Sequence, residues 1–228
     1  MGDPDLMKPR GRGRPRKDIQ RHVIQDLMAA AESVLVEKTS HEITLHEIAA
    51  AADVSEAMIH YYFGGKEGLM VAILDEIMRD APYKHAESIT QDCITQQSVE
   101  PLVARLATFY YSKASLIRMT TAELSTMSSK VRAAYSSRYF DVTPIFVENV
   151  MQSMVERDIY NDYFDVKFLA SSLFGLIMAP IVILTSTKVL SAENMNSPEW
   201  IENISRFIDL ALKAATPNKR AAPSLPSA

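Results

Sequence analysis

The sequence has little of what secreted, membrane-spanning and nucleotide-dependent proteins require. Its single cysteine, Cys93, excludes an internal disulfide framework and suits a reducing compartment. Only seven glycines occur, and they form no phosphate-binding loop or dinucleotide-binding pattern. The longest strongly apolar run, residues 174–184, contains Pro180 and is shorter than the roughly 20 residues of a membrane span. The N-terminus lacks an apolar signal-peptide core. We therefore expect a cytoplasmic protein without a membrane partner.

Local motifs for catalysis are missing as well. The histidines, glutamates and the cysteine do not occur at metal-binding spacings, and no helix carries an H-E-x-x-H pattern. Cys93 has no neighbouring residues that form a nucleophilic motif. We expect no enzyme activity, no metal and no cofactor. A diffuse active site, built from residues far apart in the sequence, is the alternative that this argument leaves open.

Apolar residues instead recur every three or four positions, which predicts an all-α fold of about nine helices. The first predicted helix begins at Asp18, and Ser197-Pro198-Glu199 is a clear start for the last one, with a cap, a first-turn proline and an acid. Pro180 lies inside a long predicted helix and predicts a kink there. Beyond residue 80 we expect helices at about 85–95, 99–118, 120–130, 136–156, 165–190 and 198–214.

The composition divides the chain into four segments. Residues 1–17 are rich in Gly, Pro and Arg and are expected to be a disordered basic arm. Residues 18–80 and residues 81–216 are expected to be two helical domains. Residues 217–228, rich in Pro, Ala and Ser, are expected to be a disordered tail.

Two short helices joined by a tight turn are predicted within residues 44–66. Thr44-x-x-Glu47 is a capping-box signature for the first of them. Asp53 occupies a turn position that favours a left-handed conformation, and Ser55 can cap the second helix, which Gly64-Gly65 ends. This is the layout of a helix-turn-helix, whose second helix enters the major groove of DNA.

Residues 43–74 resemble the DNA-binding signature of the TetR family of bacterial regulators. The matching residues are Ile43-Thr44, Ile48-Ala49, Val54-Ser55, Ile59, Tyr61-Tyr62-Phe63, Lys66 and Leu69. Three positions depart from the family pattern: Asp53 replaces the usual Gly, Met58 a Thr or Ser, and His60 the more common Tyr. The resemblance implies an N-terminal three-helix DNA-binding domain, with its linking helix, followed by a helical domain for effector binding and dimerisation.

Several residues of the motif have chemistry that suits DNA. Thr44 can bring backbone N–H groups to a phosphate, and the resemblance implies that Lys66 does so with its side chain. A carboxylate accepts from cytosine, and apolar side chains contact the thymine methyl group. Met58 facing the core is an open alternative. The predicted contacts within the motif are Thr44, Ser55, Glu56, Ala57, Met58, His60, Tyr61, Tyr62 and Lys66.

Positive charge is concentrated before the motif, although the net charge of the chain is −4. Residues 8–17 carry six basic side chains and no acid, whereas residues 18–70 carry three basic side chains against nine acids. Arg12-Gly13-Arg14-Pro15 resembles an AT-hook core, which lies in the narrow minor groove of A·T-rich DNA. A generic basic tail is the equal alternative. The predicted contacts in the arm are Arg10, Arg12, Arg14, Arg16 and Lys17.

For the second domain, the resemblance implies a small-molecule pocket. Methionines and aromatics of the middle helices suit an apolar ligand, and tyrosines with Arg118 can supply polar anchors. Methionine and aromatic side chains at helical spacing are more often plain core, which is the alternative. The candidate effector-binding residues are Phe109, Tyr110, Arg118, Met119, Met127, Tyr135, Tyr139, Phe146, Met151 and Met154.

The resemblance also implies a homodimer built on the last two long helices. The predicted helix 165–190 is apolar on most faces, so one face can pack on its own domain and another on the partner. The candidate interface residues are Phe168, Leu169, Leu173, Leu176, Ile204, Phe207, Ile208 and Leu212.

Together these expectations describe a homodimeric transcriptional regulator of the bacterial cytoplasm and nucleoid. Its partners would be double-stranded DNA, a second copy and an unknown effector. A repressor released from a palindromic operator by a small, largely apolar effector is the leading hypothesis. An activator, or a DNA-organising protein of the same fold without an effector, is the alternative.

Overall fold

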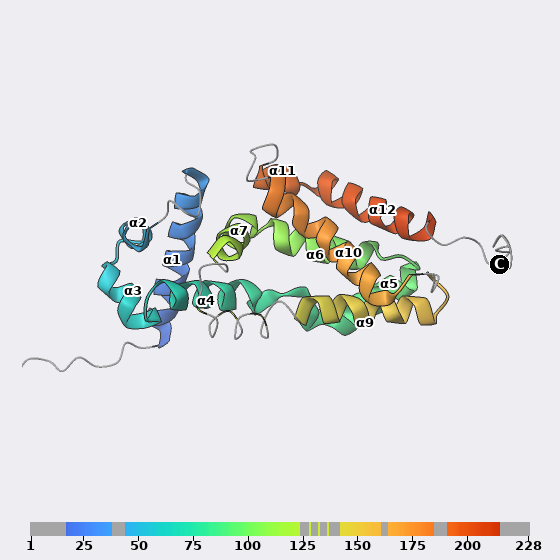
Figure 1. Ribbon diagram of the computed structural model, residues 1–228, viewed down its shortest axis with the longest axis horizontal. Coiled ribbons are helices and arrows are strands. Elements are labelled where there is room, and N and C mark those ends of the chain that lie inside the picture. Colours follow the sequence, from blue (N-terminus) through green and yellow to red (C-terminus); the bar gives the residue numbers. More distant parts are fainter. Residues whose placement is uncertain are drawn as a thin grey trace, which may run out of the picture.

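The computed structural model describes residues 17–37, 44–123, 128, 132, 136, 142–160, 164–184 and 191–214. Over these ranges the chain forms helices and no strand, which confirms the all-α prediction. Figure 1 shows an elongated molecule, with α1–α3 at one end and the second domain at the other. The α-helices are α1 (Lys17–Glu37), α2 (Leu45–Ala51), α3 (Glu56–Phe63), α4 (Lys66–Ile77), α5 (Ala86–Gln96), α6 (Glu100–Tyr111), α7 (Ala114–Glu123), α9 (Val142–Glu156), α10 (Val166–Ala179), α11 (Ala192–Met195) and α12 (Pro198–Ala214).

The N-terminal helices pack around a small apolar core. α1 lies against α2, and α3 lies against both α2 and α4. Each helix contributes at least one side chain that is almost completely buried, because its apolar residues recur at helical spacing. These side chains are Leu27, Ile48, Ile59, Leu69 and Ile73.

α4 connects this core to the second domain. It runs from the end of α3 towards α5, with the short 3₁₀ segments Met78–Asp80 and Pro82–His85 between them (Figure 1). α7 returns to pack against α1 and α4. Ser128, which follows α7, donates to Glu67 of α4 through its backbone N–H at 2.7 Å and its hydroxyl at 3.3 Å. The second domain therefore touches the first turn of α4.

The second domain is a helical bundle closed at its far end by a buried polar cluster. α12 packs on α6, and α10 packs on α9 and α6. Asp209 of α12 accepts from the Ser98 hydroxyl at 2.9 Å, the Val99 N–H at 3.1 Å and the Tyr160 hydroxyl. The Lys213 ammonium lies 2.8 Å from its other oxygen. These bonds attach α12 to the N-terminal end of α6 and to the chain after α9.

Two predicted helices differ from the structure. The predicted helix 99–118 is interrupted at Ser112, whose hydroxyl donates to the carbonyl of Phe109 at 2.9 Å, and α7 starts at Ala114. At Pro180, where the sequence predicts a kink, the chain changes from α-helix to π-helix over Pro180–Leu184. Proline has no N–H to donate within the helix, so the hydrogen-bonding pattern changes there. The predicted helix 120–130 is described only to Glu123, and 136–156 as a continuous helix only from Val142.

The stretch Val166–Ile183 is apolar enough to resemble a membrane span. Its mean hydropathy is 2.0 over 18 residues, and 33% of it is buried within the chain. By length and composition alone this stretch is long and apolar enough to cross a bilayer. The run 174–184, on which the expectation from the sequence rested, is shorter than this stretch and too short for a membrane span. The exposed large apolar side chains of this stretch are Phe168, Leu176, Val182 and Ile183, and they alternate with polar Lys167, Ser171 and Ser172.

Candidate nucleic-acid interface

The start of α2 is organised by a complete capping box. Thr44 Oγ1 accepts from the Glu47 N–H at 3.2 Å, and Glu47 Oε2 accepts from the Thr44 N–H at 2.9 Å. The Thr44 hydroxyl also donates to the same carboxylate oxygen at 3.0 Å. The predicted capping role of Thr44 is therefore confirmed. Because the hydroxyl is engaged in the cap, a phosphate contact at this position falls to the backbone N–H groups of the first turn.

The turn between α2 and α3 adopts the strained conformation that the sequence predicts. Asp53 has a φ of 53°, in the left-handed region that Asp tolerates better than most residues. Val54 is half-buried against the core, and its N–H donates to the carbonyl of Ala49 at 2.9 Å. Ser55 occupies the N-cap position of α3, but its side chain makes no capping hydrogen bond. The exposed Ser55 hydroxyl therefore contributes nothing to the start of α3.

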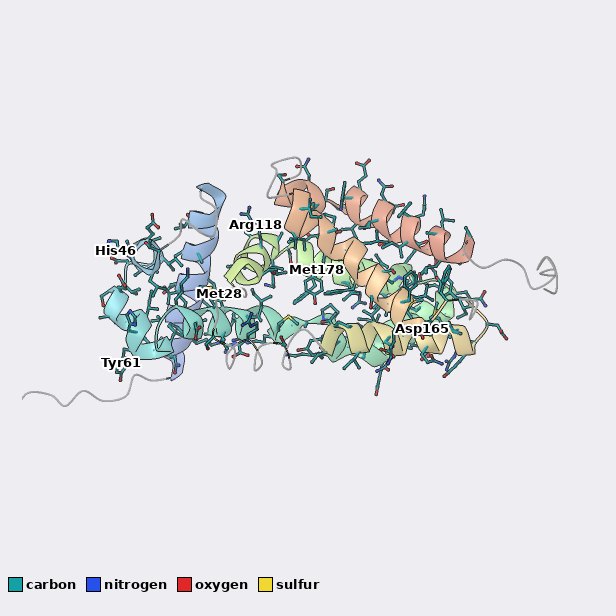
Figure 2. The ribbon with its side chains drawn as sticks, viewed as in Figure 1. Met28, His46, Tyr61, Arg118, Asp165 and Met178 are labelled. Carbon is teal, nitrogen blue, oxygen red and sulfur yellow. The ribbon has the colours of Figure 1, made fainter. Side chains whose placement is uncertain are left out.

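α3 separates a buried side from an outward side. Ile59 is fully buried, whereas Met58 is half-buried, so Ile59 takes the core position and Met58 lies at the flank. Tyr61 is 70% exposed, and its ring meets the half-buried ring of Tyr62 edge-on at 5.1 Å. Figure 2 shows Tyr61 and His46 at the outer end of the molecule, away from the second domain. Phe63, the last residue of α3, is half-buried against the core.

Two histidines flank the carboxylate at the start of α3. His46 Nδ1 of α2 lies 3.8 Å from Glu56 Oε2, and His60 Nε2 lies 3.9 Å from Glu56 Oε1. All three side chains are substantially exposed. The i, i+4 spacing of Glu56 and His60 places them on one face of α3, but the approach of His46 across the turn has no sequence signal. The outward side of the motif thus carries a carboxylate between two imidazoles.

The junction between α3 and α4 depends on three glycines. Gly64 ends α3 in the left-handed conformation with a φ of 74°. A Cβ on Gly68 would lie 1.6 Å from the carbonyl oxygen of Phe63, so only glycine fits this contact between the first turn of α4 and the end of α3. Gly65 precedes α4 with a φ of 120°, a conformation that favours glycine. Lys66, the first residue of α4, therefore lies between two glycine-dependent positions and is half-exposed.

The predicted DNA contacts thus gather at one end of the molecule where the structure describes them. Ala57 lies on the outer surface of α3 with Glu56 and His60, and Lys17 is the first residue of α1. The predicted contacts Arg10, Arg12, Arg14 and Arg16 lie outside the described residues.

The candidate effector residues are mainly packed core. Phe109, Phe146, Met151 and Met154 are buried. The hydroxyl of buried Tyr110 donates to Thr143 at 3.0 Å, and its ring meets Phe109 and Phe174 at 5.0 and 5.6 Å. Burial raises the pKa of Tyr110 to about 12, so this hydroxyl stays protonated. Arg118 is half-buried on α7. Met119 is also on α7, with a side chain outside the description, and Met127, Tyr135 and Tyr139 lie outside the described residues.

The candidate interface residues divide between two environments. Leu169, Leu173 and Ile208 are buried inside their own chain, and Ile204 and Leu212 are half-buried against its core. Phe168, Leu176 and Phe207 are exposed. The structure adds exposed side chains that the sequence interpretation omitted, namely Val182, Ile183 and Leu210.

The α1–α4 and α6–α12 surfaces each carry a groove made of described residues, and the candidate effector residues line neither of the two. The α1–α4 groove, of about 560 Å³, is lined by Gln20, Ile24, Tyr62, Phe63, Gly68, Val71, Ala72, Asp75, Glu76 and Arg79. The α6–α12 groove, of about 740 Å³, is lined by Asp92, Gln96, Glu100, Pro101, Ala104, Arg105, Thr108, Asn196, Pro198, Ile201, Glu202 and Ser205. Over the same described ranges, no group of three or more His, Cys, Asp or Glu side chains is placed to hold a metal ion.

Comparison with known proteins identifies relatives of the motif and of the fold. Residues 27–73 match the family described as bacterial regulatory proteins, tetR family. The uncharacterised HTH-type transcriptional regulator YdeS of Bacillus subtilis is 22% identical over 75% of this chain and 83% of its own length. The structure of the TetR family regulator PfmR from Thermus thermophilus superposes with a TM-score of 0.66 at 15% identity, covering 82% of this chain and 96% of PfmR. FadR from Bacillus subtilis, solved in complex with stearoyl-CoA, gives a TM-score of 0.60 at 16% identity, with 81% and 97% coverage.

Proposed function

The chain belongs to the TetR family of bacterial transcriptional regulators, and on that premise we propose that it is a homodimeric repressor. It binds a palindromic operator in DNA, and a small, largely apolar effector releases it. The observation that carries the DNA-binding part is the outward side of α3, where exposed Tyr61 and the flanked Glu56 lie on the second helix of a pair whose first helix is capped by Thr44 and Glu47. Location in the cytoplasm with the nucleoid is part of the same proposal.

We propose that base reading and phosphate contact fall to different residues. Glu56, Ala57, Met58 and His60 lie on the outward or flanking side of α3, where they can meet base edges in the major groove. Tyr62 near the end of α3, Lys66 at the start of α4 and the backbone at Thr44 before α2 suit phosphate oxygens. The arm supplies positive charge that residues 18–70 lack.

Selection from a random DNA duplex library tests the operator. A twofold-symmetric regulator enriches an inverted repeat whose half-sites are separated by about one helical turn. Enrichment of a single half-site without a symmetric partner would refute the dimeric reading. Failure to enrich any sequence over repeated rounds would refute sequence-specific DNA binding itself.

We propose that the exposed apolar face of α10 and α12 is covered by a second copy of the chain. Phe168 on α10 and Phe207 on α12 are 58% and 62% exposed, and Leu210 continues the same kind of surface. α12 also carries the Glu202–Arg206 ion pair, 3.4 Å apart, which suits the polar rim of a protein interface better than a bilayer interior.

Light scattering at the exit of a size-exclusion column tests this interface. The full chain should elute as a dimer, and the double variant Phe207→Asp/Leu210→Asp should elute as a folded monomer. Glu199→Gln, on the exposed first turn of α12, is the matched control and should remain dimeric. A monomeric wild-type chain that sediments with lipid vesicles would instead favour the membrane interpretation of α10.

The effector that we propose is an apolar small molecule. The stearoyl-CoA of FadR makes fatty acyl-CoA thioesters the first compounds to test. A bound effector raises the melting temperature of the chain by mass action and lowers its affinity for the selected operator. If operator binding is strong and no compound class changes it, an activator or a DNA-organising protein without an effector becomes the better proposal.

A further inference from the structure

The α1–α4 groove opens beside the point where the basic arm joins the folded domain. Gln20 and Ile24 line it from α1, three and seven residues after Lys17, the first residue of that helix. We propose that residues 8–16 of the arm dock into this groove when the protein is not bound to DNA. The proposal deepens the proposed function and rests on it in one respect, because it gives the arm a second partner that competes with DNA.

The chemistry of the groove matches that of the arm. Tyr62, Phe63 and Val71 supply aromatic and apolar surface, and Asp75 and Glu76 of α4 supply carboxylates. An arginine guanidinium can stack on an aromatic face while it bonds a carboxylate through its planar N–H groups. Arg79, the basic residue among the lining side chains, is bonded to Glu76, and the two acids and one base of the lining sum to a formal charge of −1. Residues 8–16 carry five basic side chains and no acid.

The dimensions of the groove also suit an extended segment of the arm. The lining residues of α4 run from Gly68 to Glu76, about 12 Å at 1.5 Å per helical residue, and Arg79 in the 3₁₀ segment Met78–Asp80 extends the groove by about 5 Å. A Pro- and Gly-rich segment in extended conformation covers about 3.1 Å per residue, so roughly five residues span the groove. The arm has enough residues to turn back from Lys17 and still fill it.

Because the arm is covalently joined to the folded domain, weak contacts are sufficient for it to dock in the α1–α4 groove. A segment joined to its own binding site through a short linker acts at an effective concentration of about a millimolar or more. An arm that binds the groove with only millimolar intrinsic affinity is therefore docked much of the time. DNA must displace the docked arm. The apparent affinity for DNA is therefore the intrinsic affinity multiplied by the fraction of molecules whose arm is undocked.

Paramagnetic relaxation enhancement measures the docked state directly. The nitroxide is attached to Gly13→Cys in the full chain; Cys93 needs no replacement, since burial raises the pKa of its thiol to about 11 and leaves it unreactive at neutral pH. We expect the methyl signals of Ile24 and Val71 to be broadened, and those of Ile201 on distant α12 to be unaffected. An excess of an A·T-rich duplex should restore the broadened signals. Unchanged Ile24 and Val71 signals in the free protein would overturn the proposal.

A charge-removal experiment gives an independent readout. Asp75→Asn in the full chain should bind the A·T-rich duplex up to about twofold more tightly, because it weakens the competitor of DNA and the arm is docked about half of the time. The same substitution should have no effect when Arg10, Arg12, Arg14 and Arg16 are replaced by glutamine. Asp80→Asn, an equal change of charge outside the groove, is the matched control and should leave affinity unchanged in both backgrounds.

The two experiments separate failure of docking from failure of the proposed function. An equal gain from Asp75→Asn in both arm backgrounds would show a general electrostatic effect and would contradict docking. If no variant binds any duplex, the proposed function fails, and the broadening of Ile24 and Val71 in the free protein still decides whether the arm docks.

Discussion

Asp209 is the residue on which the far end of the second domain depends. Its burial alone would raise the pKa of its carboxyl, but hydrogen bonds from Lys213, Tyr160 and Ser98 outweigh that effect and hold the pKa below its ordinary value. The ionised form is therefore the one that the fold stabilises. Asp209 contributes stability above the ordinary Asp pKa of about 3.9, and loses it as the pH falls from there through its lower folded pKa.

Asp209→Asn tests this contribution. We expect the free energy of unfolding at pH 7 to fall by about 1–3 kcal/mol, because the Ser98 and Tyr160 hydroxyls then face a weaker, partly mismatched acceptor. Urea unfolding at a series of pH values should show a smaller loss of stability below about pH 4 in the variant than in the wild type. Asp80→Asn, which alters an exposed carboxylate, is the control. Parallel acid profiles for wild type and Asp209→Asn would contradict the assignment.

Gly68 contributes to the stability of the α3–α4 junction because there is no space for a side chain beside the Phe63 carbonyl. Gly68→Ala forces the first turn of α4 away from α3 and should lower the free energy of unfolding by about 1–3 kcal/mol. Gly175→Ala is the matched control, because a Cβ on Gly175 meets open space in the middle of α10. That control should be neutral or stabilising by up to about 1 kcal/mol. Equal effects of the two substitutions in urea unfolding would show that close packing at Gly68 is unimportant.

At the scale of the element, α3 and the start of α4 should divide DNA binding into specificity and general affinity. Lys66→Ala should weaken binding to all sequences alike and reduce the slope of log affinity against log salt by about one. Glu56→Gln should change the preference at one base pair by about 1–3 kcal/mol and leave the slope unchanged. Fluorescence anisotropy titrations on the selected operator and its single-base variants measure both quantities. Lys113→Ala, in the turn before α7, is the lysine control.

The elements that the sequence predicted correctly are those whose ends are marked by capping or turn residues close by in the sequence. Thr44 with Glu47, Asp53 in the turn and Gly64 after α3 each act within a few residues, so the sequence alone locates α2, the turn and α3. The break at Ser112 was missed because α6 and α7 have the same helical spacing on both sides of it. The groove around Asp75, and the cluster of Asp209 with Ser98, join residues far apart in the sequence, and no periodicity reveals such contacts.

At the scale of the whole molecule, we expect the basic residues 8–17 to compensate for the acidic balance of residues 18–70 when the chain binds DNA. Deleting residues 1–17 should weaken DNA binding by at least tenfold, about 1.4 kcal/mol, and flatten its salt dependence, because fewer counterions are released from the DNA. Binding titrations from low to physiological salt measure both effects. Deleting the other terminal segment, residues 217–228, is the control. An arm-deleted chain with an unchanged salt slope would show that the arm does not contact phosphates.

The buried state of Cys93 determines how the molecule responds to oxidants. Peroxides attack the thiolate, and with a pKa of about 11 only about one thiol in ten thousand is ionised at pH 7. Side chains of the second domain also cover the sulfur completely. Peroxide concentrations that convert an exposed, acidic cysteine to a sulfenic acid therefore leave this one reduced, and oxidative stress does not act on the protein through its own thiol.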